Sequence, residues 1–201
     1  GGALCLRALF IVTVQECTFT DSRGVNAAGQ AKFGGAIYVD SDYNQANIDI
    51  LDCTFTNSFA REDGNAICIA QGGATTTIQG CNFVDCHHDG AFSVVWNWGT
   101  NSLVYKNNHI SFTNNSQSSG GLIVYHPSKV EISGSTFTRC YYPEYGCGFS
   151  YNQEGTYNYP FAEESVSIEN TIFDACYSNK NTNEEKQSTI YIFSKQSIAF
   201  T

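Results

Sequence analysis

The chain has 201 residues and a net charge of −9 at pH 7, from 19 acidic and 10 basic side chains. It contains 6 Leu against 15 Ile and 11 Val, which favours strands over helices because β-branched side chains suit a pleated sheet. The basic residues form no cluster, and no apolar run approaches the roughly 20 residues that span a bilayer. We therefore expect an all-β protein with no nucleic-acid partner and no membrane span in this segment.

The cysteine content indicates the compartment. Nine cysteines are many for a cytosolic domain and suggest an oxidising environment. Asn114 begins an N-glycosylation sequon, which points the same way. We predict a secreted or cell-surface protein. Because the chain lacks an initiator Met and starts inside a string that recurs later, we expect a piece of a longer chain.

Two short motifs alternate along the sequence, and each recurs every 25 to 36 residues. The first is glycine-rich and precedes an apolar pair, as in Gly34-Gly35-Ala36-Ile37. The second has Phe at its centre, as in Cys17-Thr18-Phe19-Thr20 and Cys53-Thr54-Phe55-Thr56. In chain order, the predicted inward pairs are Leu4/Leu6, Val12/Val14, Ile37/Val39, Ile48/Ile50, Ile67/Ile69, Phe92/Val94, Ile123/Tyr125, Val130/Ile132, Phe149/Tyr151, Val166/Ile168 and Ile190/Ile192.

Repetition in one phase predicts a parallel β-helix, because each turn of such a solenoid lies on the previous one about 4.8 Å away. Residues 1–201 would form one segment of about seven turns with both ends uncapped, and an isolated piece with unpaired strand edges should associate. An antiparallel sandwich is the alternative, but it predicts no in-phase repeat.

The two motifs also resemble a known repeat. Gly-Gly-Ala-Ile alternating with Phe-x-x-Asn is similar to the repeat of chlamydial polymorphic outer membrane proteins, and similar strings occur in surface proteins of some protists. Among the Phe-centred copies, Phe112-Thr113-Asn114-Asn115 is the one that matches Phe-x-x-Asn in full. The resemblance implies a right-handed, single-stranded parallel β-helix displayed at a cell surface with an adhesive role.

Stacking would turn equivalent residues into internal columns. The predicted aromatic column consists of Phe19, Phe55, Phe83, Phe112, Phe137, Phe173 and Phe200. Cys17, Cys53 and Cys81 lie two residues before Phe, where aligned side chains suit packed thiols better than disulfides. Cys140 and Cys176 lie at a bend on successive turns and are the best disulfide candidates. The glycines are expected to supply positive backbone dihedrals at a corner once per turn.

Parallel β-helices also include pectin lyase-like enzymes, so carbohydrate-active chemistry is an alternative function. The densest titratable group is Asp85, His87, His88 and Asp89, which could also be weak metal ligands. Adjacent side chains on an exposed bend seldom converge, and a solvated turn is the favoured interpretation. No cofactor is predicted, and catalysis is unsupported.

Two further surfaces are candidates for binding. Thr pairs that flank the inward Phe, such as Thr18/Thr20, resemble ice-binding arrays, although exposed Thr simply suits strands. The insertion 141–161 is rich in Tyr, and its rings could contact a protein or glycan, or could pack on an apolar edge. Its candidate binding residues are Tyr141, Tyr142, Tyr145, Tyr157 and Tyr159. Trp96 and Trp98 share a strand face with Phe92 and Val94, and they are expected to pack in the core or at a corner rather than to form a sugar platform.

We therefore predict a non-catalytic structural or adhesive segment of an extracellular or cell-surface protein. Its partner would be a protein or glycan ligand at a surface, or neighbouring copies of the chain in an assembly.

Overall fold

A computed structural model gives the structure of the chain. It describes residues 2–7, 11–24, 33–40, 47–71, 75–87, 93–98, 102–113, 119–125, 127, 129–142, 147–152, 165–177 and 189–194. Within these residues the secondary structure consists of strands, and the described part contains no helix long and apolar enough to cross a membrane. The all-β prediction is confirmed.

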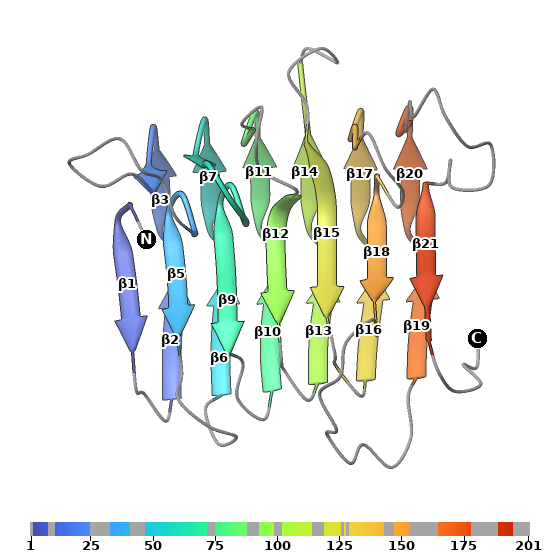
Figure 1. The fold of residues 1–201 in the computed structure, drawn as a ribbon, viewed down its shortest axis with the longest axis horizontal. Helices are drawn as coiled ribbons and strands as arrows, with labels where there is room; N and C mark the ends of the chain where they lie inside the picture. Colours follow the sequence, from blue (N-terminus) through green and yellow to red (C-terminus); the bar gives the residue numbers. More distant parts are fainter. Residues whose placement is uncertain are drawn as a thin grey trace.

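Three parallel sheets make up the fold (Figure 1). Sheet A has seven strands: β1 (Leu4–Arg7), β5 (Ile37–Asp40), β9 (Ile67–Gln71), β12 (Ser93–Trp98), β15 (Gly120–Tyr125), β18 (Phe149–Asn152) and β21 (Ile190–Phe193). Sheet B has six: β2 (Ile11–Gln15), β6 (Asn47–Leu51), β10 (Thr75–Gln79), β13 (Ser102–Lys106), β16 (Lys129–Ser133) and β19 (Ser165–Glu169). Sheet C has β3 (Thr18–Thr20), β7 (Thr54–Thr56), β11 (Asn82–Val84), β14 (His109–Ser111), β17 (Thr136–Thr138) and β20 (Ile172–Asp174), and β4 (Arg23–Gly24) pairs with β8 (Phe59–Ala60).

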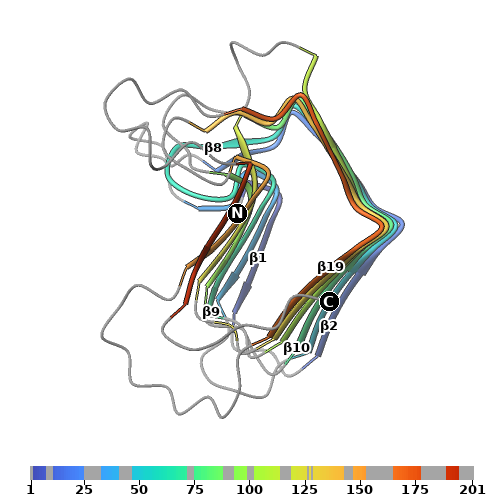
Figure 2. The ribbon, with the colours of Figure 1, turned by 90° about the vertical axis from the view of Figure 1, so that its right-hand side faces the viewer.

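Within each sheet, neighbouring strands come from successive copies of the repeat. The chain visits A, B and C in turn, and we call one such set of three strands a rung. Every strand pair is parallel, with each strand next to its equivalents in the neighbouring rungs. Viewed along the direction in which the strands stack, equivalent strands lie almost behind one another, as a solenoid requires (Figure 2). The parallel, stacked architecture is therefore consistent with the predicted β-helix.

The aromatic column is present inside the coil, with one substitution. Stacked rings join Phe19 to Phe55 at 5.0 Å between centroids, Phe55 to Phe83 at 4.8 Å, and Phe137 to Phe173 at 4.9 Å. Between these stacks the column position is Ile110, which pairs in register with Phe83 and with Phe137.

The prediction that Phe112 belongs to this column is therefore wrong. Phe112 is buried, but it lies one residue beyond the end of β14. Phe200, the last predicted member of the column, lies outside the described residues.

One strand of sheet A, β15, is shifted by one residue from its predicted phase, and β12 departs from it in part. In β12 Val94 lies in the central core as predicted, but so does its neighbour Val95, which pairs with Ile67 and Leu122; Phe92 lies outside the described residues. In β15 the central core contains Leu122 and Val124, and not the predicted pair Ile123 and Tyr125. The physical reason is the side-chain period of two, because one additional residue moves a whole strand face from inside to outside.

The corner between sheets B and C is the most regular part of the coil. Two residues separate the strands at every passage, and the first has a positive φ: Glu16, Asp52, Gly80, Asn107, Gly134 and Asn170. The second is Cys17, Cys53, Cys81, Asn108, Ser135 or Thr171. Cys53, Ser135 and Thr171 each donate to the carbonyl two residues earlier, at 3.1, 3.0 and 2.9 Å. Thiols and hydroxyls thus serve the same purpose here, which supports the packed-thiol interpretation.

The glycine motif is needed for more than backbone dihedrals. Gly34 and Gly64 have positive φ as predicted, at 67° and 64°. At Gly121 and Gly148, however, a Cβ would lie 2.6 and 2.5 Å from the Cδ1 of Phe137 and Phe173. Glycine makes room for the ring from the facing sheet, so the two motifs are sterically linked where these rings pack.

Candidate binding surface

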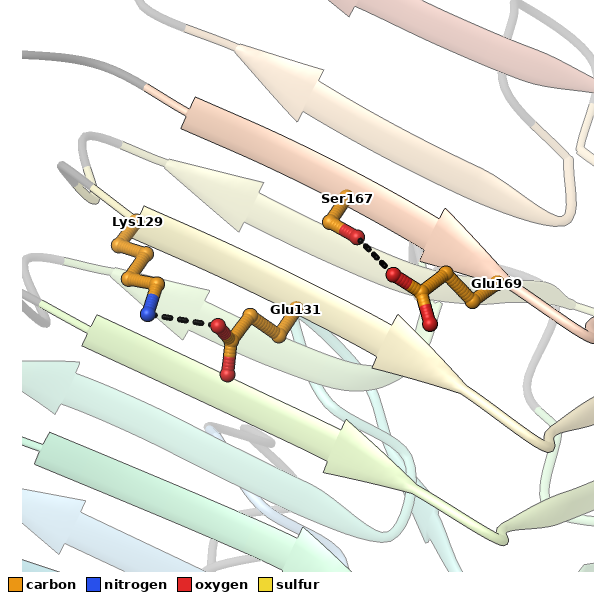
Figure 3. Close-up of polar contacts among 4 residues, drawn as sticks. All are labelled: Lys129, Glu131, Ser167 and Glu169. Carbon is orange, nitrogen blue, oxygen red and sulfur yellow. Dashed lines mark hydrogen bonds and ion pairs between the residues drawn. The ribbon is translucent and has the colours of Figure 1, made fainter. Parts of the chain in front are cut away.

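The outward faces of sheets A and B differ in character. Apart from Ile11 on β2, which is 73% exposed, sheet B is mostly polar outside. Lys129 Nζ lies 2.6 Å from Glu131 Oε1 on β16, and on β19 Ser167 donates to Glu169 Oε1 at 3.3 Å (Figure 3). Each pair lies within one strand at alternate positions and is exposed or half-buried. This face has the ordinary composition of a solvated sheet.

Sheet A instead has a second apolar cluster on its outer side. Because side chains alternate along a strand, residues next to the inward positions point away from the coil. On β5, β9, β12 and β15 these residues are largely aromatic or apolar. We call this cluster, with Phe33 before β5, the aromatic face; it comprises Phe33, Tyr38, Cys68, Ala70, Trp96, Trp98, Ile123 and Tyr125.

The rings of the aromatic face contact one another across the strands. Trp96 lies at its centre: its ring centroid is 6.3 Å from that of Phe33, 5.6 Å from Trp98 and 5.8 Å from Tyr125. Phe33 also stacks on Tyr38 at 5.9 Å. Trp96 is buried, whereas the other four rings are half-buried. Trp96 and Trp98 are packed, as expected, but in this second cluster on the outward side of sheet A and not in the central core.

Titratable groups beside the aromatic face are poorly hydrated. Burial, with help from Asp40, raises the pKa of Tyr38 to about 12, and burial raises the pKa of Cys68 well above its ordinary value. Burial, then repulsion from Glu62, raises the pKa of Asp63 to about 6. The Asp63 carbonyl accepts from Gly34 N at 3.0 Å, which places this acid beside Phe33. The edge of the face thus combines rings with a carboxyl group that resists ionisation.

Asp63 should make folding stability pH-dependent. A carboxyl whose folded pKa is raised contributes stability that is fully present below its unfolded pKa, here 3.8, and is lost as pH rises to about 6. At pH 7 we expect Asp63→Asn to be more stable than the parent by about 1 to 2 kcal/mol, a figure discounted for partial solvent screening. Urea unfolding between pH 4 and 7 measures this. Glu131→Gln, on the outward face of sheet B, is the control, and equal pH slopes in the parent and Asp63→Asn would contradict the assignment.

The predicted Tyr-rich insertion is divided by a core strand. β18 lies inside residues 141–161, and Tyr151 on it is buried and donates to the Pro127 carbonyl at 3.0 Å. Tyr142 is also buried, and the Tyr141 ring lies 4.8 Å from that of Tyr177. Tyr145, Tyr157 and Tyr159 lie outside the described residues, so their binding role stays a prediction.

Of the predicted acid and histidine group, the structure describes Asp85 and His87. Asp85 accepts hydrogen bonds from Thr113, through N at 2.8 Å and Oγ1 at 3.1 Å, and His87 Nδ1 contacts the Asp85 carbonyl at 2.9 Å. These are contacts of a corner that ties neighbouring rungs together. His88, Asp89 and Asn114 fall outside the described residues. Within the described part, no three His, Cys, Asp or Glu side chains could hold a metal ion.

All nine cysteines carry free thiols, including Cys140 and Cys176. The outward Thr pairs of sheet C align between Thr18/Thr20 and Thr54/Thr56. The two following strands interrupt this array with Asn82/Val84 and His109/Ser111, so the described face does not form a continuous Thr ladder.

Comparisons with protein families, curated proteins and solved structures find no match for the chain. The aromatic face was missed in the sequence because both sides of β12 and β15 are apolar. An available signal was the aromatic side chain at Tyr38, Trp96 and Tyr125, each next to an apolar residue of the same strand.

Proposed function

We propose that the chain is a non-catalytic, adhesive segment of a secreted or cell-surface protein. In this proposal the strands form a right-handed β-helix of about seven turns, akin to the surface repeats that the motifs resemble. The coil acts as a rigid spacer and presents a recognition surface. The aromatic face is the observation that carries this function, because the outward side of sheet B is mostly polar.

The chemistry of the aromatic face suits a glycan or a protein surface. Amphipathic rings provide large contact area at low entropic cost, and such rings are enriched where surfaces bind one another. Trp98 and Tyr125 are register neighbours, so their rings form a contiguous part of this surface. With a net charge of −9, the chain favours neutral or basic ligands over anionic ones.

Binding to an immobilised glycan array tests this function. We expect Trp98→Ala and Tyr125→Ala each to weaken binding at least about tenfold, the loss typical of a truncated interface aromatic. Lys129→Ala and Glu131→Ala on the polar face of sheet B are the matched controls, and they should bind like the parent chain. Retained binding in both aromatic variants, or equal losses in the controls, would exclude the aromatic face as the site.

A further inference from the structure

Two thiols lie next to each other on adjacent rungs after the last strands of sheet C. Cys140 follows β17 and Cys176 follows β20. The register Thr138 with Asp174, and the bridge between Tyr141 and Tyr177, keep the two cysteines side by side. Register neighbours have Cα atoms about 4.8 Å apart, within the roughly 4.4 to 6.8 Å that a disulfide spans. The Cys140 thiol also hydrogen bonds to Cys176.

The two thiols differ in access and acidity, as an attacking and a resolving thiol should. Cys140 is fully buried, whereas Cys176 is half-buried between the exposed residues Ala175 and Tyr177. The hydrogen bond from Cys140 lowers the pKa of Cys176, and burial raises that of Cys140. The accessible sulfur is therefore also the one that forms a thiolate more easily, and the thiolate is the reactive species.

A second pair gives an internal comparison. Cys17 and Cys53 are register neighbours and, like Cys140 and Cys176, lie 36 residues apart. The Cys53 thiol donates to the Leu51 carbonyl at 3.1 Å, and burial raises its pKa. Each pair combines a half-buried thiol, Cys17 or Cys176, with a buried one, Cys53 or Cys140. Both half-buried thiols donate to backbone carbonyls, Cys17 to Gln15 at 3.2 Å and Cys176 to Phe137 at 3.3 Å.

We propose that Cys140 and Cys176 close a disulfide when a low-molecular-weight disulfide, such as oxidised glutathione, is present. The Cys176 thiolate attacks one glutathione sulfur, the glutathione S–S bond breaks, and the departing thiolate takes up the proton that Cys176 lost. Cys140 then gives up its proton and attacks the Cys176 sulfur of the mixed disulfide, which releases the second glutathione as a thiol. Two protein thiols are oxidised, and one glutathione disulfide is reduced to two thiols.

The disulfide would join two rungs across a connection that contains β18 and the Tyr-rich range 141–161. Closing a long segment restricts the unfolded chain, so the oxidised form resists unfolding. Serine is a suitable replacement at both positions. Ser58 is buried at the same place in an earlier rung, three residues after Phe55, as Cys140 is after Phe137.

The test incubates the whole chain with oxidised glutathione, alkylates the remaining thiols and maps the peptides by mass spectrometry. We expect a linked peptide pair containing Cys140 and Cys176, lighter by about 2 Da than the sum of the two thiol peptides. The melting temperature should rise by roughly 5 to 10 °C in the parent chain and in Cys17→Ser, but not in Cys140→Ser/Cys176→Ser.

Three outcomes would overturn the proposal. They are alkylation of both thiols after oxidation, a glutathione adduct that persists on Cys176 without the link, and closure of Cys17 with Cys53 as fast as Cys140 with Cys176. Peptide mapping of the parent chain decides among them even if the double variant does not fold.

Discussion

Phe55→Ala is expected to lower the free energy of unfolding by about 3 to 5 kcal/mol, among the largest losses that one side chain can cause. Phe55 is fully buried and stacks on Phe19 on one side and on Phe83 on the other, with interplanar angles of 9° and 8°. Removing the ring deletes two aromatic contacts and leaves a void that the in-register strands cannot close. Since domains are stable by only about 5 to 15 kcal/mol, this loss approaches half of the total.

Guanidinium chloride unfolding, followed by tryptophan fluorescence and circular dichroism, measures this loss. Phe55→Ile is the matched control, because Ile110 occupies the same column in a later rung, and we expect it to cost less than half as much. An Ala variant as stable as the Ile variant would show that the stacked column contributes little to stability.

Gly35→Ala is expected to destabilise the fold by about 3 kcal/mol or more, or to prevent its formation, although it adds a single methyl group. A Cβ at Gly35 would lie 2.0 Å from the Asn65 carbonyl oxygen and 2.7 Å from the backbone N and C of Phe59. All three atoms belong to the main chain, so no side-chain rotation can relieve the overlap. The hydrogen bond from Gly35 N to Gly64 O, at 3.1 Å, would be strained at the same time.

The control for this substitution is Gly24→Ala. The nearest atom to its added Cβ, the Gly34 carbonyl oxygen, lies 3.0 Å away, so a small shift suffices and we expect a loss below about 1 kcal/mol. The comparison uses soluble yield and denaturant midpoint for both variants. If Gly35→Ala unfolded at the same midpoint as Gly24→Ala, the close packing between these rungs would be refuted.

The fold was predictable because the repeat carries phase information. Phe19, Phe55 and Phe83 recur at matching places in their motifs, and such regularity requires stacked, parallel strands. The wrong placement of Phe112 in the aromatic column rested on the likeness of its short motif to the other Phe-centred motifs. Counting from the positive-φ corner residue Asn107 would have selected Ile110, just as counting from Asp52 selects Phe55.

The candidate surface was harder to predict than the core. Alternation separates the two faces of a strand, but it does not say which face is inside when both are apolar. On β12 the side chains of Val95 and Trp96 are both hydrophobic and both buried. The choice between them depends on the register with Ile67 and Leu122, which comes from long-range pairing rather than from the strand's own residues.

The constant corner between sheets B and C has a consequence for how this architecture can vary. Two residues always link sheet B to sheet C. The link from sheet A to sheet B varies in length, from residues 8–10 after β1 to residues 153–164 after β18. Length variation is therefore confined to the two other edges of the coil, while the B–C edge has the same length in every rung. Peptides inserted into the A-to-B links at residues 8–10 or 99–101 would not change the B–C edge. Rungs added or removed beyond the aromatic face would repeat the same B–C corner, so the length of the molecule could change while that face stays as it is.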